Sequence, residues 1–146
     1  MGRIERSIEI RAPPEKVWEA LAFDRHPEWS EQYKSVEYTS EVNTPEDKYK
    51  VGASCRMNTK EGIVEIKIIE SLKNEKIMYR VQGMKGVRNV NGTFTLKPTE
   101  AGTKITAVSE YEMSNLMMKM LAKLASKALE KDFEKGLEKL KSILEK

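Results

Sequence analysis

The chain has 146 residues, of which 39% are hydrophobic and 34% charged, enough for one domain to bury a core. Its 26 basic and 23 acidic residues leave a net charge of +3, and this near balance argues against a dedicated nucleic-acid binder. A single cysteine excludes an internal disulfide and suits a reducing compartment. No apolar run approaches the ~20 residues that cross a bilayer. We therefore expect one domain over residues 1–146 in a cytoplasmic protein without stable membrane insertion.

The opening of the chain predicts a strand followed by two short helices. Isoleucines alternate with polar residues over residues 4–10, which is the period of a half-buried strand. Pro13 and Pro14 end this strand and open a helix, because the missing N–H of proline costs nothing in a first helical turn. The sequence HPEWSEQY, residues 26–33, predicts another short helical turn.

Six further strands are predicted from alternating apolar and polar residues. The apolar positions, taken strand by strand, are Val36, Tyr38 and Val42; Ala53, Cys55 and Met57; Val64, Ile66 and Ile68; Ile77, Tyr79 and Val81; Val90, Phe94 and Leu96; Ile105, Ala107 and Tyr111. Short polar links such as KNE and TEAG suit antiparallel hairpins, whereas the polar stretch NTPEDKYKVG predicts a loop. One apolar face along nearly every strand predicts a sheet that is covered on one side only.

From about residue 114 the period changes to that of an amphipathic helix of ~30 residues, about 45 Å long. Its apolar stripe comprises Ala122, Ala125, Leu129, Phe133, Gly136, Leu140 and Ile143. A second apolar stripe is confined to the first half of the helix and comprises Leu116, Met117, Met118, Met120, Leu121 and Leu124. A twisted sheet that curls around one straight helix should leave an elongated apolar cavity. The methionines suit varied ligands, although they could equally fill a core or contact a dimer partner.

The stretches IERSIEIRAPPEKVWEAL, HPEW and NGTFTLKPTEAGTKIT, followed by the long helix, resemble the START-related helix-grip (SRPBCC) superfamily. Within it they are most similar to the polyketide cyclase/dehydrase and lipid-transport group. The resemblance implies an α+β fold in the order β-α-α-β6-α, with a curved antiparallel sheet of about seven strands around the C-terminal helix and a ligand cavity between them. The glycine-rich loop of the plant pathogenesis-related members is missing, since VGASCRMNT offers no such run.

Besides Trp29, we expect a ligand to contact two groups of residues. One group lies at strand positions that the alternating pattern turns toward the apolar face, and the other lies on the second apolar stripe of the long helix. The full set is Trp29, Tyr38, Met57, Ile66, Tyr79, Phe94, Tyr111, Met117, Met120, Leu121 and Leu124. Tyrosine hydroxyls could orient the polar end of a ligand, because cavities commonly place a few polar groups in an apolar wall. The alternative is that each hydroxyl is satisfied within the core.

Three other side chains are candidates for chemistry. His26 is the only histidine, and because it precedes Pro27 in a turn we expect it at the surface or in a cap. Cys55 is expected to be a small buried thiol, and these two residues alone cannot build a zinc site. In the alternating pattern of residues 4–10, Arg6 falls on the same face as the isoleucines. A buried arginine there would need an acidic partner or an anionic ligand, unless the start of the strand faces water.

These patterns favour a module that binds, and in some settings transports, a small hydrophobic or lipid-like molecule, as a monomer or homodimer. We expect no catalytic residues, cofactor or metal, and we lean against an enzyme because no nucleophile–base set or nucleotide-binding loop is present. Two alternatives stay open: a cyclase or dehydratase acting on a hydrophobic polyketide-like substrate, and an interaction or stress-associated protein.

Overall fold

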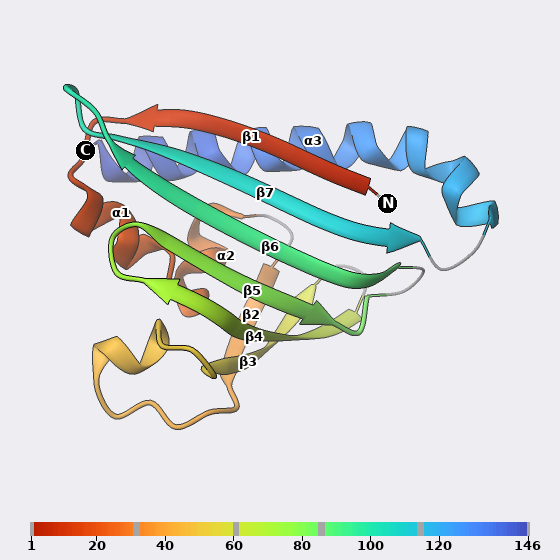
Figure 1. The fold of residues 1–146 in the computed structure, drawn as a ribbon, viewed down its shortest axis with the longest axis horizontal. Helices are drawn as coiled ribbons and strands as arrows, with labels where there is room; N and C mark the ends of the chain where they lie inside the picture. The colour runs from red at the N-terminus through yellow and green to blue at the C-terminus, as the bar shows by residue number, and fades with distance from the viewer. Residues whose placement is uncertain (1, 31–32, 60–61, 85–86, 114–115, 146) are drawn as a thin grey trace.

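An antiparallel sheet of seven strands and one long C-terminal helix dominate the computed structural model (Figure 1). The model describes residues 2–30, 33–59, 62–84, 87–113 and 116–145, and for residues 116–129 it describes the backbone alone. The elements are β1 (Gly2–Ile10), α1 (Pro14–Ala20), the 3-10 turn η1 (Phe23–Arg25), α2 (His26–Trp29), β2 (Tyr33–Tyr38), the 3-10 turn η2 (Pro45–Lys48), β3 (Ser54–Thr59), β4 (Gly62–Leu72), β5 (Lys76–Gln82), β6 (Val87–Pro98), β7 (Thr103–Met113) and α3 (Leu116–Leu144).

The strand order places β1 and β2 at opposite edges of the sheet, although they are consecutive strands in the sequence. Strands β2 to β7 form a meander of antiparallel neighbours, and β1 pairs with β7. The segment that carries α1, η1 and α2 must therefore pass from one edge of the sheet to the other, across the apolar face. Figure 1 shows α1 and α2 in this position, between the two edges. This segment and α3 together cover the face that the alternating pattern leaves apolar.

Helix α3 runs along β1 and also contacts β7, α1 and α2. Leu137 and Leu140 are buried on its inner side. The Nζ of Lys141 donates to the backbone carbonyl of Glu9 (3.1 Å), which ties the last turns of α3 to β1. The helix therefore covers the β1–β7 edge of the sheet, as its apolar stripe predicts. None of the helices among the described residues combines the length and hydropathy that crossing a bilayer requires.

Two predicted boundaries are wrong. The strand predicted to reach Val42 ends at Tyr38, because the N–H groups of Thr39 and Ser40 both donate to the carbonyl of Ser54 and the regular ladder stops there. The helical turn predicted over residues 26–33 ends at Trp29, and Tyr33 already begins β2.

Candidate functional site

Two adjoining cavities lie beneath the sheet, with volumes of about 100 Å³ and about 40 Å³. The larger is lined by Ile4, Tyr33, Tyr79, Val81, Met84, Val87, Val90, Gly92, Ser109, Tyr111, Met113 and Phe133. The smaller is lined by His26, Trp29, Ser30, Tyr33, Tyr79, Phe94, Ala107, Asp132, Phe133, Gly136 and Leu137. Tyr33, Tyr79 and Phe133 line both, so the two spaces share a wall.

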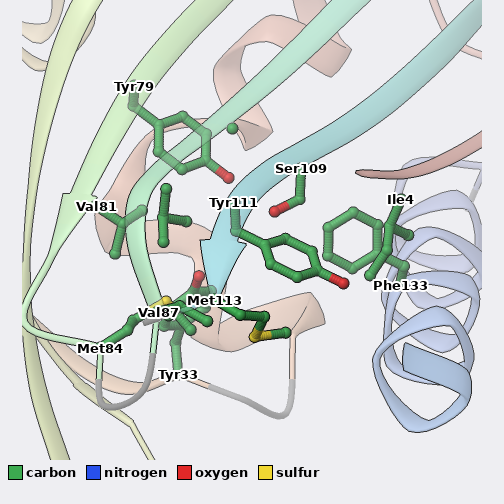
Figure 2. A pocket seen from close by; sticks show the side chains of 12 residues that line it. Ile4, Tyr33, Tyr79, Val81, Met84, Val87, Ser109, Tyr111, Met113 and Phe133 are labelled. Carbon is green, nitrogen blue, oxygen red and sulfur yellow. The ribbon is translucent and has the colours of Figure 1, made fainter. Parts of the chain in front are cut away.

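The floor of the larger cavity is a row of residues paired across neighbouring strands, and small residues in this row leave space above the sheet. Tyr79 on β5 pairs with Gly92 on β6, Gly92 with Ser109 on β7, and Ser109 with Ile4 on β1. A Cβ on Gly92 would lie only 2.3 Å from Cζ of Tyr79, so the tyrosine ring lies flat over the glycine. A flat ring beside a glycine and a serine leaves space that taller side chains would fill. Figure 2 shows this space between Tyr79 and Val81 on one side and Ile4 and Phe133 on the other.

A second glycine–tyrosine pair lies one row further along the sheet. Gly2 on β1 pairs with Tyr111 on β7, and a Cβ on Gly2 would lie 2.3 Å from Cζ of the tyrosine. Tyr111 is 9% exposed and lines the larger cavity (Figure 2). The same arrangement, a glycine paired across strands with a tyrosine, thus shapes two neighbouring rows of the cavity floor.

His26 is buried, so the surface position is wrong, whereas the expected capping role is confirmed by its hydrogen bond to Leu21, the C-cap residue of α1. Only 2% of the residue is exposed, and its Nε2–H donates to the backbone carbonyl of Leu21 (3.2 Å). Burial lowers the pKa of His26 from 6.5 to about 4, against the opposing effects of the Leu21 hydrogen bond and the charge of Asp24. The imidazole is therefore neutral at pH 7. Because Nε2 carries the proton, Nδ1 is left as an acceptor, and it has no hydrogen-bond partner among the described residues.

Aromatic rings surround the imidazole and explain its burial. Ring centroids lie 4.7 to 5.9 Å from that of His26 for Trp29, Phe23, Tyr33 and Phe94. The Nε1–H of Trp29 donates to the carbonyl of Ala20 (3.1 Å), which fixes the indole against α1. These rings supply much of the apolar wall of the smaller cavity, whose polar side chains are those of His26, Ser30, Tyr33, Tyr79 and Asp132.

The structure brings together some of the predicted ligand contacts and leaves others apart. Tyr79 and Tyr111 line the larger cavity, and Trp29, Tyr79 and Phe94 line the smaller one. Three of the predicted contacts line neither cavity, namely Tyr38, Met57 and Ile66. The four predicted contacts on the helix, Met117, Met120, Leu121 and Leu124, have side chains outside the described part of the chain.

The three predicted contacts outside the cavities have other environments. Met57 and Ile66 are at most 1% exposed and pack in the core. The hydroxyl of Tyr38 donates to Oδ1 of Asp24 (3.3 Å), so it is satisfied within the protein. Burial, reinforced by the charge of Asp24, raises the pKa of Tyr38.

Tyr33 and Tyr79, which line both cavities, are neutral hydrogen-bonding groups at pH 7. Burial raises the pKa of Tyr33 to about 12 and raises that of Tyr79 as well. Figure 2 shows the hydroxyls of Tyr79, Tyr111 and Ser109 among the apolar side chains of the larger cavity. The site therefore combines an apolar wall with a few uncharged polar groups, which is the usual make-up of a small-molecule pocket.

The other two chemical candidates lie outside both cavities. Cys55 is buried as predicted, and burial raises the pKa of its thiol to about 12, so it is not a thiolate at neutral pH. Arg6 faces α3, where its guanidinium pairs with Glu130 (3.0 Å) and Glu134 (2.9 Å). The acidic partner that its inward parity required is thus supplied by the helix.

Sequence reasoning missed His26, Tyr33, Gly92 and Phe133 as residues of the site. An isolated glycine inside an alternating strand often marks a close approach by another group, and this signal could have identified Gly92. Phe23, His26 and Trp29 recur at a spacing of three, which could have indicated one aromatic cluster. Phe133 was predicted only as part of the helix stripe.

A family model described as polyketide cyclase/dehydrase and lipid transport matches residues 1–145. The chain belongs to this family. A search of curated proteins gives no match.

Solved structures share the fold at low sequence identity. The solution structure of a Bacillus halodurans protein has a TM-score of 0.76 and 19% identity, covering 99% of this chain and 98% of that one. A START superfamily protein from Mycobacterium smegmatis has a TM-score of 0.73 and 18% identity, covering 93% and 94%. The Aha1 dimer from Colwellia psychrerythraea has a TM-score of 0.71 and 19% identity, covering 99% and 97%. The curved antiparallel sheet with its C-terminal helix is thus that of START-like proteins.

Proposed function

We propose that this member of the polyketide cyclase/dehydrase and lipid-transport family binds a small hydrophobic molecule between its sheet and α3, with residues 1–146 acting as one binding domain. In this proposal α3 is the gripped helix of a helix-grip fold, and the segment from α1 to α2 plugs the rest of the apolar face. The observation that carries the proposal is the larger cavity, whose floor is held open by the flat ring of Tyr79 over Gly92. Transport would follow if the bound molecule were handed on.

The size of the site suggests the first probe. An apolar cavity of ~150 Å³ stays dry and takes up benzene. The larger cavity, of about 100 Å³, adjoins a second one across a shared wall. Toluene is therefore a suitable neutral probe, and its binding can be followed by the amide shifts of residues that line the cavities. Native mass spectrometry of freshly purified protein would reveal a larger resident ligand.

A matched pair of variants on β7 tests the location of the site. Ser109 lies in the cavity floor, whereas Val108, one residue earlier, points to the opposite face of the sheet. Ser109→Phe should fill the cavity and abolish toluene binding, and Val108→Phe should retain it. Binding of toluene to neither the wild-type protein nor the Val108→Phe variant would refute the proposal, as would undiminished binding to Ser109→Phe.

Catalysis is less well supported than binding. His26, two tyrosines and Asp132 line the same small cavity, but no hydrogen bond joins His26 to Asp132 among the described residues, and Asp132 is exposed. A general base usually needs a partner that orients it. The cavity therefore supports recognition of a ligand more directly than a reaction on it.

A further inference from the structure

The polar groups of the two cavities are almost all uncharged. Among the described residues, the lining includes no lysine and no arginine. Its one carboxylate is Asp132, an exposed residue of α3 at the smaller cavity. Among the described lining residues an anionic ligand finds no counter-charge, and Asp132 would repel it.

One residue that lines the smaller cavity carries a buried polar atom without a partner among the described residues. Nδ1 of His26 has no hydrogen-bond partner, and the residue is 2% exposed. Nε2 is committed to the carbonyl of Leu21, which leaves Nδ1 as the acceptor on a ring that lines the cavity. A buried acceptor without a donor destabilises the folded state, so a donor that reaches it is bound favourably.

The neighbouring side chains do not supply that donor. The ring of Tyr33 lies 5.8 Å from that of His26, between centroids, and its hydroxyl makes no hydrogen bond to the histidine. Phe23, Trp29 and Phe94 pack around the imidazole, and the N–H of Trp29 is already bonded to Ala20. None of these described side chains donates to Nδ1. The atom itself has almost no accessible surface, so a ligand reaches it only when one of the surrounding rings moves.

We infer that the site takes a neutral, hydroxyl-bearing hydrophobic ligand, an alcohol or phenol, whose O–H donates to Nδ1 of His26 while its apolar part occupies the larger cavity. This inference rests on the proposed function and specifies the class of ligand. The low pKa of His26 supports it, because the imidazole stays neutral and keeps its acceptor at pH 7. Carboxylates such as fatty acids cannot make this hydrogen bond, since a carboxylate has no proton to donate at that pH.

The experiment compares three probes of similar size: toluene, phenol and benzoate. Toluene and phenol differ by a methyl group in place of a hydroxyl. Because they also differ in hydration, the hydrogen bond is isolated by comparing their affinity ratio in the wild-type protein with that in His26→Phe. Relative to toluene, we expect phenol to bind about tenfold more tightly to the wild-type protein than to His26→Phe, and we expect benzoate not to bind at pH 7. His26 is the only histidine, so its side-chain ¹⁵N signals are unambiguous. The Nδ1 signal should move on addition of phenol and stay in place with toluene.

Two variants localise the effect. His26→Phe keeps an aromatic ring and removes the acceptor, so phenol should lose its advantage over toluene. Tyr38→Phe removes the hydroxyl of a half-buried tyrosine that lies outside both cavities, and it should keep the preference for phenol. If His26→Phe does not fold, the Nδ1 signal of the wild-type protein still decides the question.

The outcomes separate the inference from the proposed function. The same ratio of phenol to toluene affinity in the wild-type protein and in His26→Phe, or phenol binding without a shift of Nδ1, would overturn the inference and leave the proposed function standing. Tighter binding of benzoate than of phenol would do the same. An Nδ1 already bonded to an ordered water that phenol does not displace would also overturn it. Failure of all three probes would overturn both.

Discussion

Replacing Gly92 with alanine should close the larger cavity at little cost in stability. The added Cβ would lie 2.3 Å from Cζ, 2.4 Å from the hydroxyl oxygen and 2.6 Å from Cε2 of Tyr79. Carbon atoms pack best at about 3.5–4.0 Å, so the ring must move by roughly 1 Å or more. The space next to it is the cavity, and the ring should therefore swing into it.

The magnitude follows from two opposing effects. Adding a methyl group to a filled core typically costs about 1–3 kcal/mol. An empty volume of about 100 Å³ corresponds to about 2 kcal/mol of destabilisation at ~24 cal/mol per Å³, part of which is recovered when a ring enters it. We expect Gly92→Ala to lower the free energy of unfolding by no more than about 1 kcal/mol, a fall in Tm of about 4 °C at most.

The assay combines urea denaturation with toluene titration. Gly92→Ala should weaken toluene binding at least about tenfold, because the ring of Tyr79 occupies the site. In the Tyr79→Leu background the same alanine should have no further effect, since the ring that it displaces is gone. A stability loss of ~3 kcal/mol in both backgrounds, or an unchanged toluene affinity, would refute the reasoning and indicate that the floor is already packed.

Three further measurements test the buried and paired groups. Between pH 6.5 and 4 the unfolded chain binds a proton at His26 and the folded one does not, so the free energy of unfolding should fall by about 3 kcal/mol over this interval. That slope should vanish in His26→Phe, whereas the contribution of Asp47, whose pKa is lowered to about 2, is lost only as the pH falls below about 4. Arg6→Gln should cost less than about 1 kcal/mol in urea denaturation, and less still at high salt, because its ion pairs are partly exposed. Cys55 should react with a thiol reagent only as fast as the protein unfolds, and rapid labelling of the native protein would contradict its burial.

The sequence predicts the sheet and the long helix because both depend on local periods. Inward parity correctly places Met57 and Tyr79 on the apolar face, since both are buried. The alternating pattern cannot distinguish these two residues. Met57 packs in the core and Tyr79 lines the cavities, and this difference depends on how α2 and α3 cover the sheet. That covering is a long-range property, set by the pairing of β1 with β7 and by the crossing segment.

His26 illustrates the same limit from the side of chemistry. Its neighbour Pro27 and its place in a turn suggest a surface residue, and local sequence offers nothing stronger. The burial depends partly on Phe94, which lies on β6 and reaches the imidazole only after the sheet has formed (ring centroids 5.9 Å apart). A buried acceptor without a donor can therefore be recognised only in three dimensions.

The two imperfections of this core lie next to each other, and one ligand would remove both. An enclosed dry void of the larger cavity's volume would cost about 2 kcal/mol, a sizeable part of the 5–15 kcal/mol that stabilises a typical domain. The bare Nδ1 of His26 adds a further penalty of about 1–3 kcal/mol in the adjoining space. A ligand present at a hundred times its Kd stabilises a protein by about 2.7 kcal/mol, which is comparable with the cost of the void. Occupancy of the site should therefore act on this fold as the missing part of its core.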